Sequence, residues 1–277
     1  MYTSSNFAAR MKFTCATYNI LHGYHRDLIL NNIRFLMERS ADVICLQEAE
    51  VGFEEPLKKL IALDGWEMRS VHAGFGGNVA TLWNARKLQL ASAEVLPLPD
   101  LKTPLSLRRL NGMSGKIKRV ALIATFDLEG HALQITNVHL DWEGGARHRM
   151  RQLKHLRQML DDSRADFRII TGDFNTVAPR PLRRYHERRV ERALGEEFRN
   201  AFPRLPWTYD LSWVDPSDGM QFIATLARAG LKWRQRFDYM FAKDMTVLEG
   251  QMHDLPGSDH RPLIATFGLS AQKMMLQ

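Results

Sequence analysis

Several apolar runs in this chain end abruptly in carboxylate, carboxamide and imidazole side chains. Near the C-terminus, Ser258 is followed by Asp259 and His260, and residues 171–175 read Thr-Gly-Asp-Phe-Asn. Strand ends of this kind place polar groups where irregular backbone and solvent access make chemistry possible. Such clusters suit the metal-assisted hydrolysis of phosphate esters.

More polar residues stand at the ends of other apolar runs. The combined candidate set is Asn19, Glu48, His139, Asp173, Asn175, Asp238, Asp259 and His260. Hard oxygen donors dominate this set and thiols do not contribute, which favours Mg²⁺, with Mn²⁺ as the alternative, over zinc. We therefore expect a magnesium site that performs phosphoryl chemistry.

The motifs around these residues closely resemble those of the endonuclease/exonuclease/phosphatase superfamily, which includes deoxyribonuclease I, AP endonucleases, neutral sphingomyelinases and inositol polyphosphate 5-phosphatases. Five motifs occur in the family's order: Tyr-Asn-Ile at 18–20, Leu-Gln-Glu at 46–48, Gly-Asp-Phe-Asn at 172–175, Phe-Asp-Tyr at 237–239 and Ser-Asp-His at 258–260. The resemblance covers nearly the whole chain. It implies an α+β fold of the DNase I-like type, a four-layer α/β/β/α sandwich in which two packed mixed β-sheets are flanked by helices.

The same resemblance implies how the metal and the attacking water are held. Glu48 would be the principal metal ligand, with Asn19 nearby, and Asp259 would bind the metal region or fix the neighbouring histidine. Asp173 would orient or deprotonate the water, and Asn175 would hold Asp173 and the phosphate.

Two imidazoles complete the implied site. His260, with Asp238 fixing its tautomer, and His139 would neutralise charge that develops on the phosphoryl oxygens. AP endonucleases carry an Asp two positions after the first Asn, where this chain has Leu21, and a Tyr where it has His139. The site is therefore more similar to those of deoxyribonuclease I, sphingomyelinase or 5-phosphatase. Asn78 is a candidate for orienting His139 or contacting phosphate.

Basic residues are unevenly distributed along the chain. The net charge is +7, from 38 Lys and Arg against 31 Asp and Glu, and residues 146–160 hold basic but no acidic side chains. Residues 180–192 are rich in Arg. An amphipathic helix commonly places Arg on its solvated face, but these segments would also suit phosphates, with Trp side chains stacking on bases. We expect Trp142 and Arg147, which follow His139, to contact substrate.

These observations favour a Mg²⁺-dependent phosphoesterase that hydrolyses phosphodiester bonds by activated-water attack, most simply a nuclease acting on DNA or RNA. One alternative is a phosphoesterase acting on a phospholipid or inositol phosphate headgroup, which would be sphingomyelinase-like or 5-phosphatase-like. A second alternative is a catalytically inactive nucleic-acid-binding module on the same fold. The completeness of the carboxylate and imidazole set argues against the inactive module.

Hydrophobic periodicity predicts the elements that position these residues. Residues 12–48 follow a strand, helix, strand pattern, and residues 120–139 form a hairpin. A basic helix is expected at 146–160, a strand at 167–171, and the last strands at 237–241 and 263–267. Hairpins interrupted by amphipathic helices indicate two packed sheets instead of one doubly wound sheet.

The 277 residues are expected to form a single domain at 11–269, with a flexible segment at 1–10 and a C-terminal tail at 270–277. Cys15 and Cys45 lie in apolar runs and are expected to be buried core thiols, as in a reducing cytoplasm. No signal peptide or transmembrane segment is expected, which indicates a cytoplasmic protein, and we expect a monomer. The remaining histidines are expected to be surface or structural: His22, His25, His72, His131, His148, His155, His186 and His253.

Overall fold

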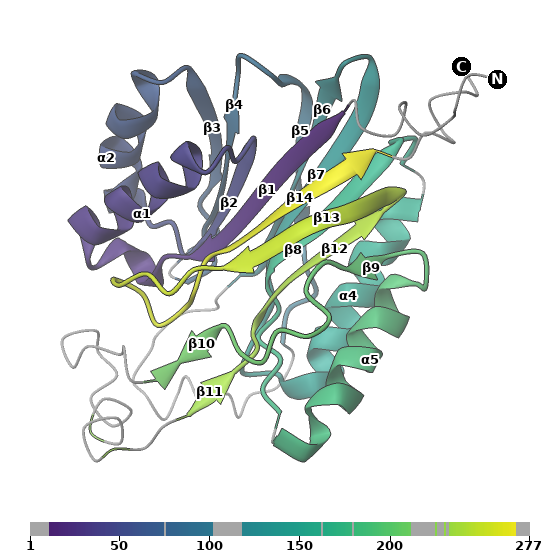
Figure 1. Cartoon of the computed structure of the whole chain (residues 1–277). Coiled ribbons are helices and arrows are strands. Elements are labelled where there is room, and N and C mark those ends of the chain that lie inside the picture. Colours follow the sequence, from purple (N-terminus) through teal and green to yellow (C-terminus); the bar gives the residue numbers. More distant parts are fainter. Residues whose placement is uncertain are drawn as a thin grey trace.

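The computed structural model describes residues 11–74, 76–101, 118–161, 163–178, 180–211, 225, 230 and 233–269. The expected flexible segment at 1–10 and the tail at 270–277 lie outside these residues. In the described part of the chain, two six-stranded mixed sheets lie face to face, with helices on their outer faces (Figure 1). The predicted four-layer α/β/β/α sandwich is confirmed.

The first sheet has the order β13-β14-β1-β2-β4-β3. Its strands are β1 (Lys12–Asn19), β2 (Val43–Gln47), β3 (Trp66–Val71), β4 (Val79–Asn84), β13 (Met245–Met252) and β14 (Leu263–Leu269). Strands β1 and β2 run parallel and α1 (Arg26–Glu38) connects them, as the strand, helix, strand pattern predicted. Every residue of β2 is buried, so its polar neighbour Glu48 marks where the apolar environment ends.

The second sheet has the order β5-β6-β7-β8-β12-β9. Its strands are β5 (Gln89–Pro97), β6 (Val120–Leu128), β7 (His131–His139), β8 (Phe167–Asp173), β9 (Arg199–Asn200) and β12 (Asp238–Lys243). The predicted hairpin at 120–139 is β6 paired antiparallel with β7. A separate small ribbon pairs β10 (Tyr209–Asp210) with β11 (Arg234–Gln235).

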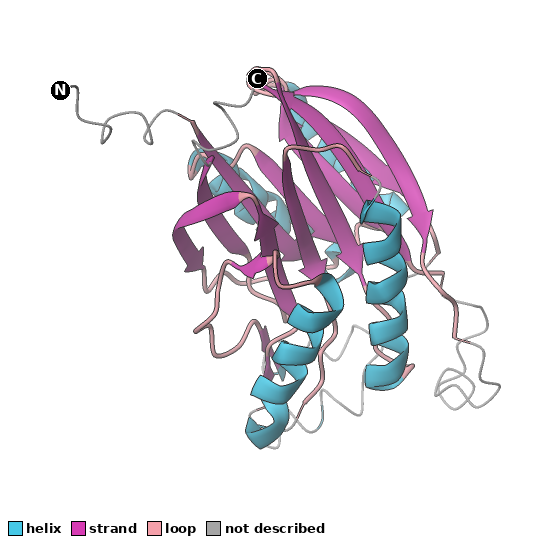
Figure 2. Cartoon of the chain, turned by 90° about the vertical axis from the view of Figure 1, so that its right-hand side faces the viewer, coloured by secondary structure: helices cyan, strands magenta, loops and turns pink. Residues whose placement is uncertain are grey.

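Helices cover the outer face of each sheet. Helices α1 and α2 (Val51–Ala62) cover the first sheet, and α4 (Gly145–Asp161) and α5 (Arg183–Leu194) cover the second. Figure 2 shows α4 and α5 side by side on that outer face. Short 3-10 turns precede α1 and α5, namely η1 (Leu21–Gly23) and η2 (Arg180–Leu182). No helix among the described residues is long and apolar enough to cross a membrane.

Apolar side chains separate the layers. Between the sheets lie Phe13, Phe126 and Phe167 together with Cys15 and Cys45, whose free thiols are buried as predicted. Further apolar clusters fill the spaces beneath α1 and α2 and beneath α4 and α5. Each fully buried aliphatic or aromatic side chain contributes about 1.5–3 kcal/mol. This packing holds the ends of the two sheets in a fixed mutual position.

Candidate active site

The candidate residues converge because their strands end at the same edge of the sandwich. In the second sheet, β7 and β8 run parallel and place His139 opposite Asp173. Strand β12 runs antiparallel to β8 and begins with Asp238, also opposite Asp173. In the first sheet, β1 ends at Asn19, and Glu48 directly follows β2. Two sheets therefore contribute polar side chains to one site.

Hydrogen bonds across the sheets join these residues. The amide Nδ2 of Asn19 donates to Oδ2 of Asp173 at 3.0 Å and to Oε1 of Glu48 at 3.3 Å. The hydroxyl of Ser258 donates to the main-chain oxygen of Asn19 at 2.8 Å and accepts from the main-chain nitrogen of His260 at 3.0 Å. The loop before β14 is thereby fixed to the end of β1.

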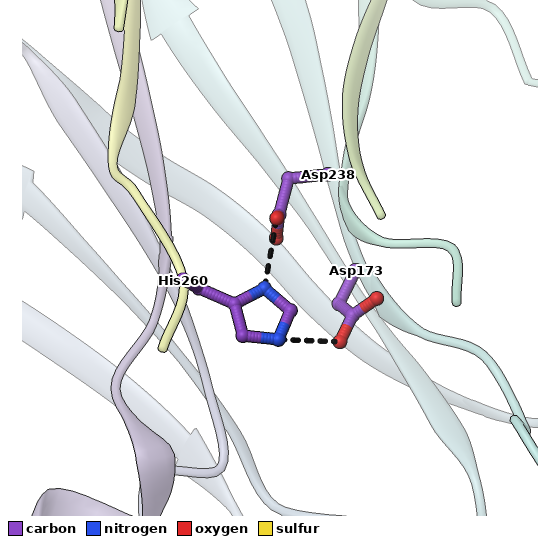
Figure 3. A group of neighbouring side chains, drawn as sticks. All are labelled: Asp173, Asp238 and His260. Atoms are coloured by element: carbon purple, nitrogen blue, oxygen red, sulfur yellow. Dashed lines mark hydrogen bonds and ion pairs between the residues drawn. The ribbon is translucent and has the colours of Figure 1, made fainter. Parts of the chain in front are cut away.

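His260 lies between two carboxylates (Figure 3). Its Nδ1 is 2.8 Å from Oδ2 of Asp238, and its Nε2 is 3.7 Å from Oδ2 of Asp173. Burial alone would lower the pKa of His260, but the negative charges of Asp238 and Asp173 outweigh it and raise the pKa to about 10. The imidazole is therefore a cation at neutral pH. Although the ligand atoms of these residues lie within 4.8 Å of one another, a doubly protonated ring has no lone pair to bind a metal.

Asp173 is buried at the centre of the site. Burial raises the pKa of its carboxyl to about 7, although the charge of His260 opposes the shift. Its Oδ1 accepts a hydrogen bond from the main-chain nitrogen of Asn175 at 2.8 Å. The side-chain amide of Asn175 instead donates to the main-chain oxygen of Leu140 at 2.9 Å. A carboxyl with a pKa near neutrality can accept and release a proton at physiological pH.

The structure supplies a partner for His139 that the sequence did not identify. Nη1 of Arg119 lies 2.9 Å from Nδ1 of His139. Nε2 of His139 faces Oδ2 of Asp173 at 3.5 Å and Oε1 of Glu48 at 3.8 Å. Burial lowers the pKa of His139 well below its usual range, and the charge of Arg119 lowers it further. His139 is thus a neutral imidazole. In the sequence, the one signal for Arg119 was that a basic residue directly precedes the apolar strand at 120–126.

His22 also joins the site, although the sequence gave it no special role. Its Nε2 is 3.0 Å from Oε2 of Glu48, and its Nδ1 is 3.1 Å from Oε1 of Glu50. Asn78 was expected to orient His139 or to contact phosphate, but its side chain bonds elsewhere. Its Nδ2 donates to Oε2 of Glu50 at 2.5 Å, and its Oδ1 accepts from the main-chain nitrogen of Ala73. Asn78 therefore fixes Glu50, which in turn orients His22.

The carboxylates of the site suit a divalent cation. Asp259 is buried, and burial raises its pKa to about 6, to which the charge of Glu48 adds. Oε2 of Glu48 is buried and faces Nε2 of His22 at 3.0 Å. Carboxylate oxygens are the ligands that Mg²⁺ and Mn²⁺ prefer. Glu48 and Asp259 would offer such oxygens to a metal. The side-chain oxygen of Asn19 accepts from the main-chain nitrogen of Leu21 at 3.1 Å and keeps a second lone pair.

The remaining candidates lie outside this cluster. Trp142 is 43% exposed in the segment after β7, and Arg147 is exposed near the start of α4. Arg147 lines an open groove of about 450 Å³ together with Arg151, Lys154 and His155. The groove presents basic side chains along one face of α4.

A buried polar network between the two sheets supports the site. Nε2 of Gln47 donates to Oδ1 of Asn137 at 2.8 Å, which joins β2 to β7 across the sandwich. Nδ2 of Asn137 donates to the main-chain oxygens of Leu46 at 3.1 Å and Ala80 at 2.9 Å. These hydrogen bonds fix the spacing between the strand ends that carry Glu48 and His139.

Comparisons with known proteins identify the family of this chain and bear out its fold. Residues 16–260 match the Endonuclease/Exonuclease/phosphatase family, and the chain belongs to that family. Its fold is that of a family of phosphoesterases.

Among similar proteins is a UPF0294 protein of Vibrio vulnificus (strain YJ016), 26% identical over 86% of this chain and 71% of that protein. The endonuclease/exonuclease/phosphatase from Bacteroides vulgatus superposes with a TM-score of 0.69 at 17% identity, covering 94% of this chain and 100% of that one. The crystal structure of D. rerio TDP2 complexed with single strand DNA product also gives a TM-score of 0.69 at 17% identity, with 93% and 99% covered.

Proposed function

We propose that this protein is a divalent-metal-dependent phosphodiesterase, using Mg²⁺ or Mn²⁺, that hydrolyses nucleic acid by attack of a water molecule on phosphorus. The observation that carries the proposal is the convergence of Glu48, Asp173, His139 and the Asp238–His260 pair at facing ends of two sheets. Carboxylates, a cationic imidazole and a neutral imidazole together provide a proton acceptor and donors to a phosphoryl group.

A bound metal ion at Glu48 and Asp259 would supply positive charge to the phosphoryl oxygens. Asp173 would orient the water and accept its proton, a role for which its pKa of about 7 is well matched. Asn19 and the main-chain nitrogen of Asn175 would hold the carboxylate in position. The water oxygen would form a new bond to phosphorus while the bond between phosphorus and the ester oxygen breaks. The leaving oxygen would take a proton from solvent, which yields a phosphate monoester and an alcohol.

The two imidazoles would act on the extra negative charge of the transition state. His260, held as a cation by Asp238, would bind a phosphoryl oxygen by charge and hydrogen bond. His139 would donate from Nε2 while Arg119 keeps its Nδ1 occupied. Removing one such preorganised donor typically costs about 10²–10³ in turnover.

Nucleic acid is the substrate that the basic surface favours. Arg147, Arg151 and Lys154 line the groove on α4, where they would neutralise successive backbone phosphates. Trp142 would offer an exposed ring to a base. The structural likeness to a TDP2 chain complexed with a single strand DNA product supports the same substrate class.

The test is hydrolysis of single-stranded DNA, RNA and plasmid DNA with Mg²⁺ or Mn²⁺, repeated after treatment with EDTA. We expect cleavage that EDTA abolishes and added metal restores. Sphingomyelin and inositol phosphates form a parallel panel, and preferential turnover of either would overturn the nucleic-acid assignment. Binding of DNA without hydrolysis of any of these esters would instead indicate an inactive binding module.

A further inference from the structure

The hydroxyl of Thr208 holds the first residues of β12. Thr208 directly precedes β10, and its side chain is fully buried. Its Oγ1 accepts hydrogen bonds from the main-chain nitrogens of Phe237 and Asp238, each at 3.0 Å. These two donors occupy both lone pairs of the hydroxyl. Strand β9 pairs with β12 farther along, at Phe241 and Ala242, so a side chain instead of a strand bonds the main chain at Asp238.

The main chain around Thr208 holds the segment that carries His260. The main-chain oxygen of Thr208 accepts a hydrogen bond from the main-chain nitrogen of Arg261 at 2.7 Å. The next residue, Tyr209, forms an antiparallel bridge with His260, and its ring meets the imidazole edge-on at a centroid separation of 5.2 Å. Residues 208–210 therefore lie beside this loop as a short added strand.

Thr208 thus bonds two segments that belong to different sheets. Asp238 begins β12 of the second sheet, and His260 precedes β14 of the first. Pairing within either sheet does not set the distance between them, yet Nδ1 of His260 is 2.8 Å from Oδ2 of Asp238. A charge-assisted hydrogen bond of this length weakens when either partner moves. The hydroxyl of Thr208 holds the Asp238 side, and its carbonyl oxygen holds the His260 side.

We propose that Thr208 is a positioning residue that sets the contact between Asp238 and His260 and so holds the imidazole where it meets the phosphoryl group. The effect on turnover rests on the proposed function, whereas the effect on the Asp238–His260 contact does not. Because His260 would act on charge that develops in the transition state, its displacement lowers turnover more than it weakens substrate binding.

The test compares the wild-type protein with Thr208→Val, Thr208→Ser and the control Thr14→Val. Valine has the shape of threonine but accepts no hydrogen bond, so the two main-chain N–H groups lose their acceptor. Serine retains the hydroxyl. Thr14 is also buried, and its hydroxyl bonds that of Thr266 at 3.1 Å, near the opposite end of β1 from Asn19.

Two readouts follow the contact and the chemistry separately. Proton NMR at neutral pH detects the Nδ1 proton of His260, which a short hydrogen bond to a carboxylate shifts downfield, and His260→Gln assigns the resonance by its absence. Kinetics on single-stranded DNA give kcat and KM. Thr208→Val should move the resonance upfield and lower kcat by about tenfold to a hundredfold, with little change in KM. Thr208→Ser and Thr14→Val should retain both the resonance and kcat.

Three results would overturn the proposal. One is an unmoved His260 resonance in folded Thr208→Val. The others are an equal change in Thr14→Val, which would assign the effect to general packing, and an equal change in Thr208→Ser, which would assign it to the methyl group. If the wild-type protein hydrolyses no phosphate ester and the resonance still moves only in Thr208→Val, the phosphodiesterase is wrong and the positioning role stands.

A second pair of variants keeps the test decisive if Thr208→Val does not fold, as judged by circular dichroism. Thr208→Ala leaves room for a water molecule to bond the two N–H groups, and it differs from Thr208→Ser by the hydroxyl alone. The alanine variant should show the shifted His260 resonance and the lower kcat, and the serine variant should not. Identical spectra and kcat in the two variants would contradict the assignment.

Discussion

Nη1 of Arg119 lies 2.9 Å from Nδ1 of His139, and the same nitrogen donates to the main-chain oxygen of Gly76. A guanidinium can only donate, so Nδ1 of His139 must accept and the proton of the neutral ring resides on Nε2. That nitrogen faces Asp173 and Glu48. The pair therefore produces a histidine that is preset as a hydrogen-bond donor.

Replacing Arg119 by Met should allow His139 to carry its proton on either ring nitrogen. The pKa of His139 should rise because a positive charge is removed, yet stay below its usual value because burial is the larger cause of the shift. Turnover should fall by about tenfold or more, as for a donor that is no longer held in place. NMR of ¹⁵N-histidine-labelled protein would report both the tautomer and the pKa. Arg119→Lys retains the charge and is the matched control; an unaltered His139 spectrum in Arg119→Met would refute the coupling.

Asp238→Asn should shift the pH dependence of stability. The folded pKa of His260 is about 10 against an ordinary 6.5, so its contribution is fully present below about pH 6.5 and is lost as pH rises through about 10. The Asn variant loses the main charge that raises this pKa, so its loss of stability should be largest at about pH 6 and should shrink as the pH approaches about 10. Urea unfolding of EDTA-treated protein between pH 6 and about pH 10 measures the difference. A constant offset between the two proteins at every pH would contradict the assignment.

Asp173→Asn should separate stability from activity. The folded pKa of Asp173 is about 7 against an ordinary 3.8. The native state therefore retains a proton that the unfolded state releases, and this group lowers stability as pH rises from about 4 to about 7. In metal-free protein, the free energy of unfolding of the Asn variant should therefore not show this decrease between about pH 4 and about pH 7. Turnover of the metal-loaded variant should drop by about 10³ or more. Retention of near-normal turnover would exclude Asp173 as the proton acceptor.

The pattern of apolar strands and amphipathic helices predicted two packed sheets flanked by helices, and the family resemblance implied the four-layer sandwich with its site at one end of the sheets. Buried runs such as Val43–Gln47 end where the environment becomes polar, so Glu48 was conspicuous. The proximity of Asp238 and His260 followed from family resemblance and is found as a 2.8 Å contact. Patterning of this kind specifies where a strand ends and which residue stands there.

Arg119 and His22 were missed for physical reasons. Arg119 precedes β6, and only the antiparallel pairing with β7 places it beside His139, a relation that hydrophobic periodicity does not encode. His22 reaches Glu48 through a left-handed turn at Leu21 and His22, a conformation that a bulky aliphatic residue such as Leu rarely adopts. Asn78 was selected for a phosphate or histidine contact, but loop geometry directs it to Glu50.

Asn137→Leu should destabilise the protein more than its size change suggests. Asn137 is fully buried and bonds Gln47 and the main-chain oxygens of Leu46 and Ala80. Leucine would leave the two main-chain oxygens without this donor, at about 1–3 kcal/mol for each unsatisfied group, whereas Nε2 of Gln47 retains other acceptors. We expect a loss of about 3 kcal/mol or more in the free energy of unfolding by urea titration. Asn84→Leu, at the partly exposed end of β4, serves as the control, and an equal effect in both variants would argue against a role for the network.

The groove on α4 can be separated from the chemistry by changing only charge. Arg151→Gln combined with Lys154→Gln removes two cations that line the groove. If the groove follows a single-stranded backbone, the slope of log affinity against log salt should decrease in magnitude by about 1.4 for the two lost contacts. Hydrolysis of a small chromogenic phosphodiester should be unchanged, because it does not reach the groove. Arg188→Gln combined with Arg192→Gln removes the same charge from exposed positions on α5 and is the matched control. Equal loss of DNA affinity in both pairs would mean that overall charge, not this groove, holds the strand.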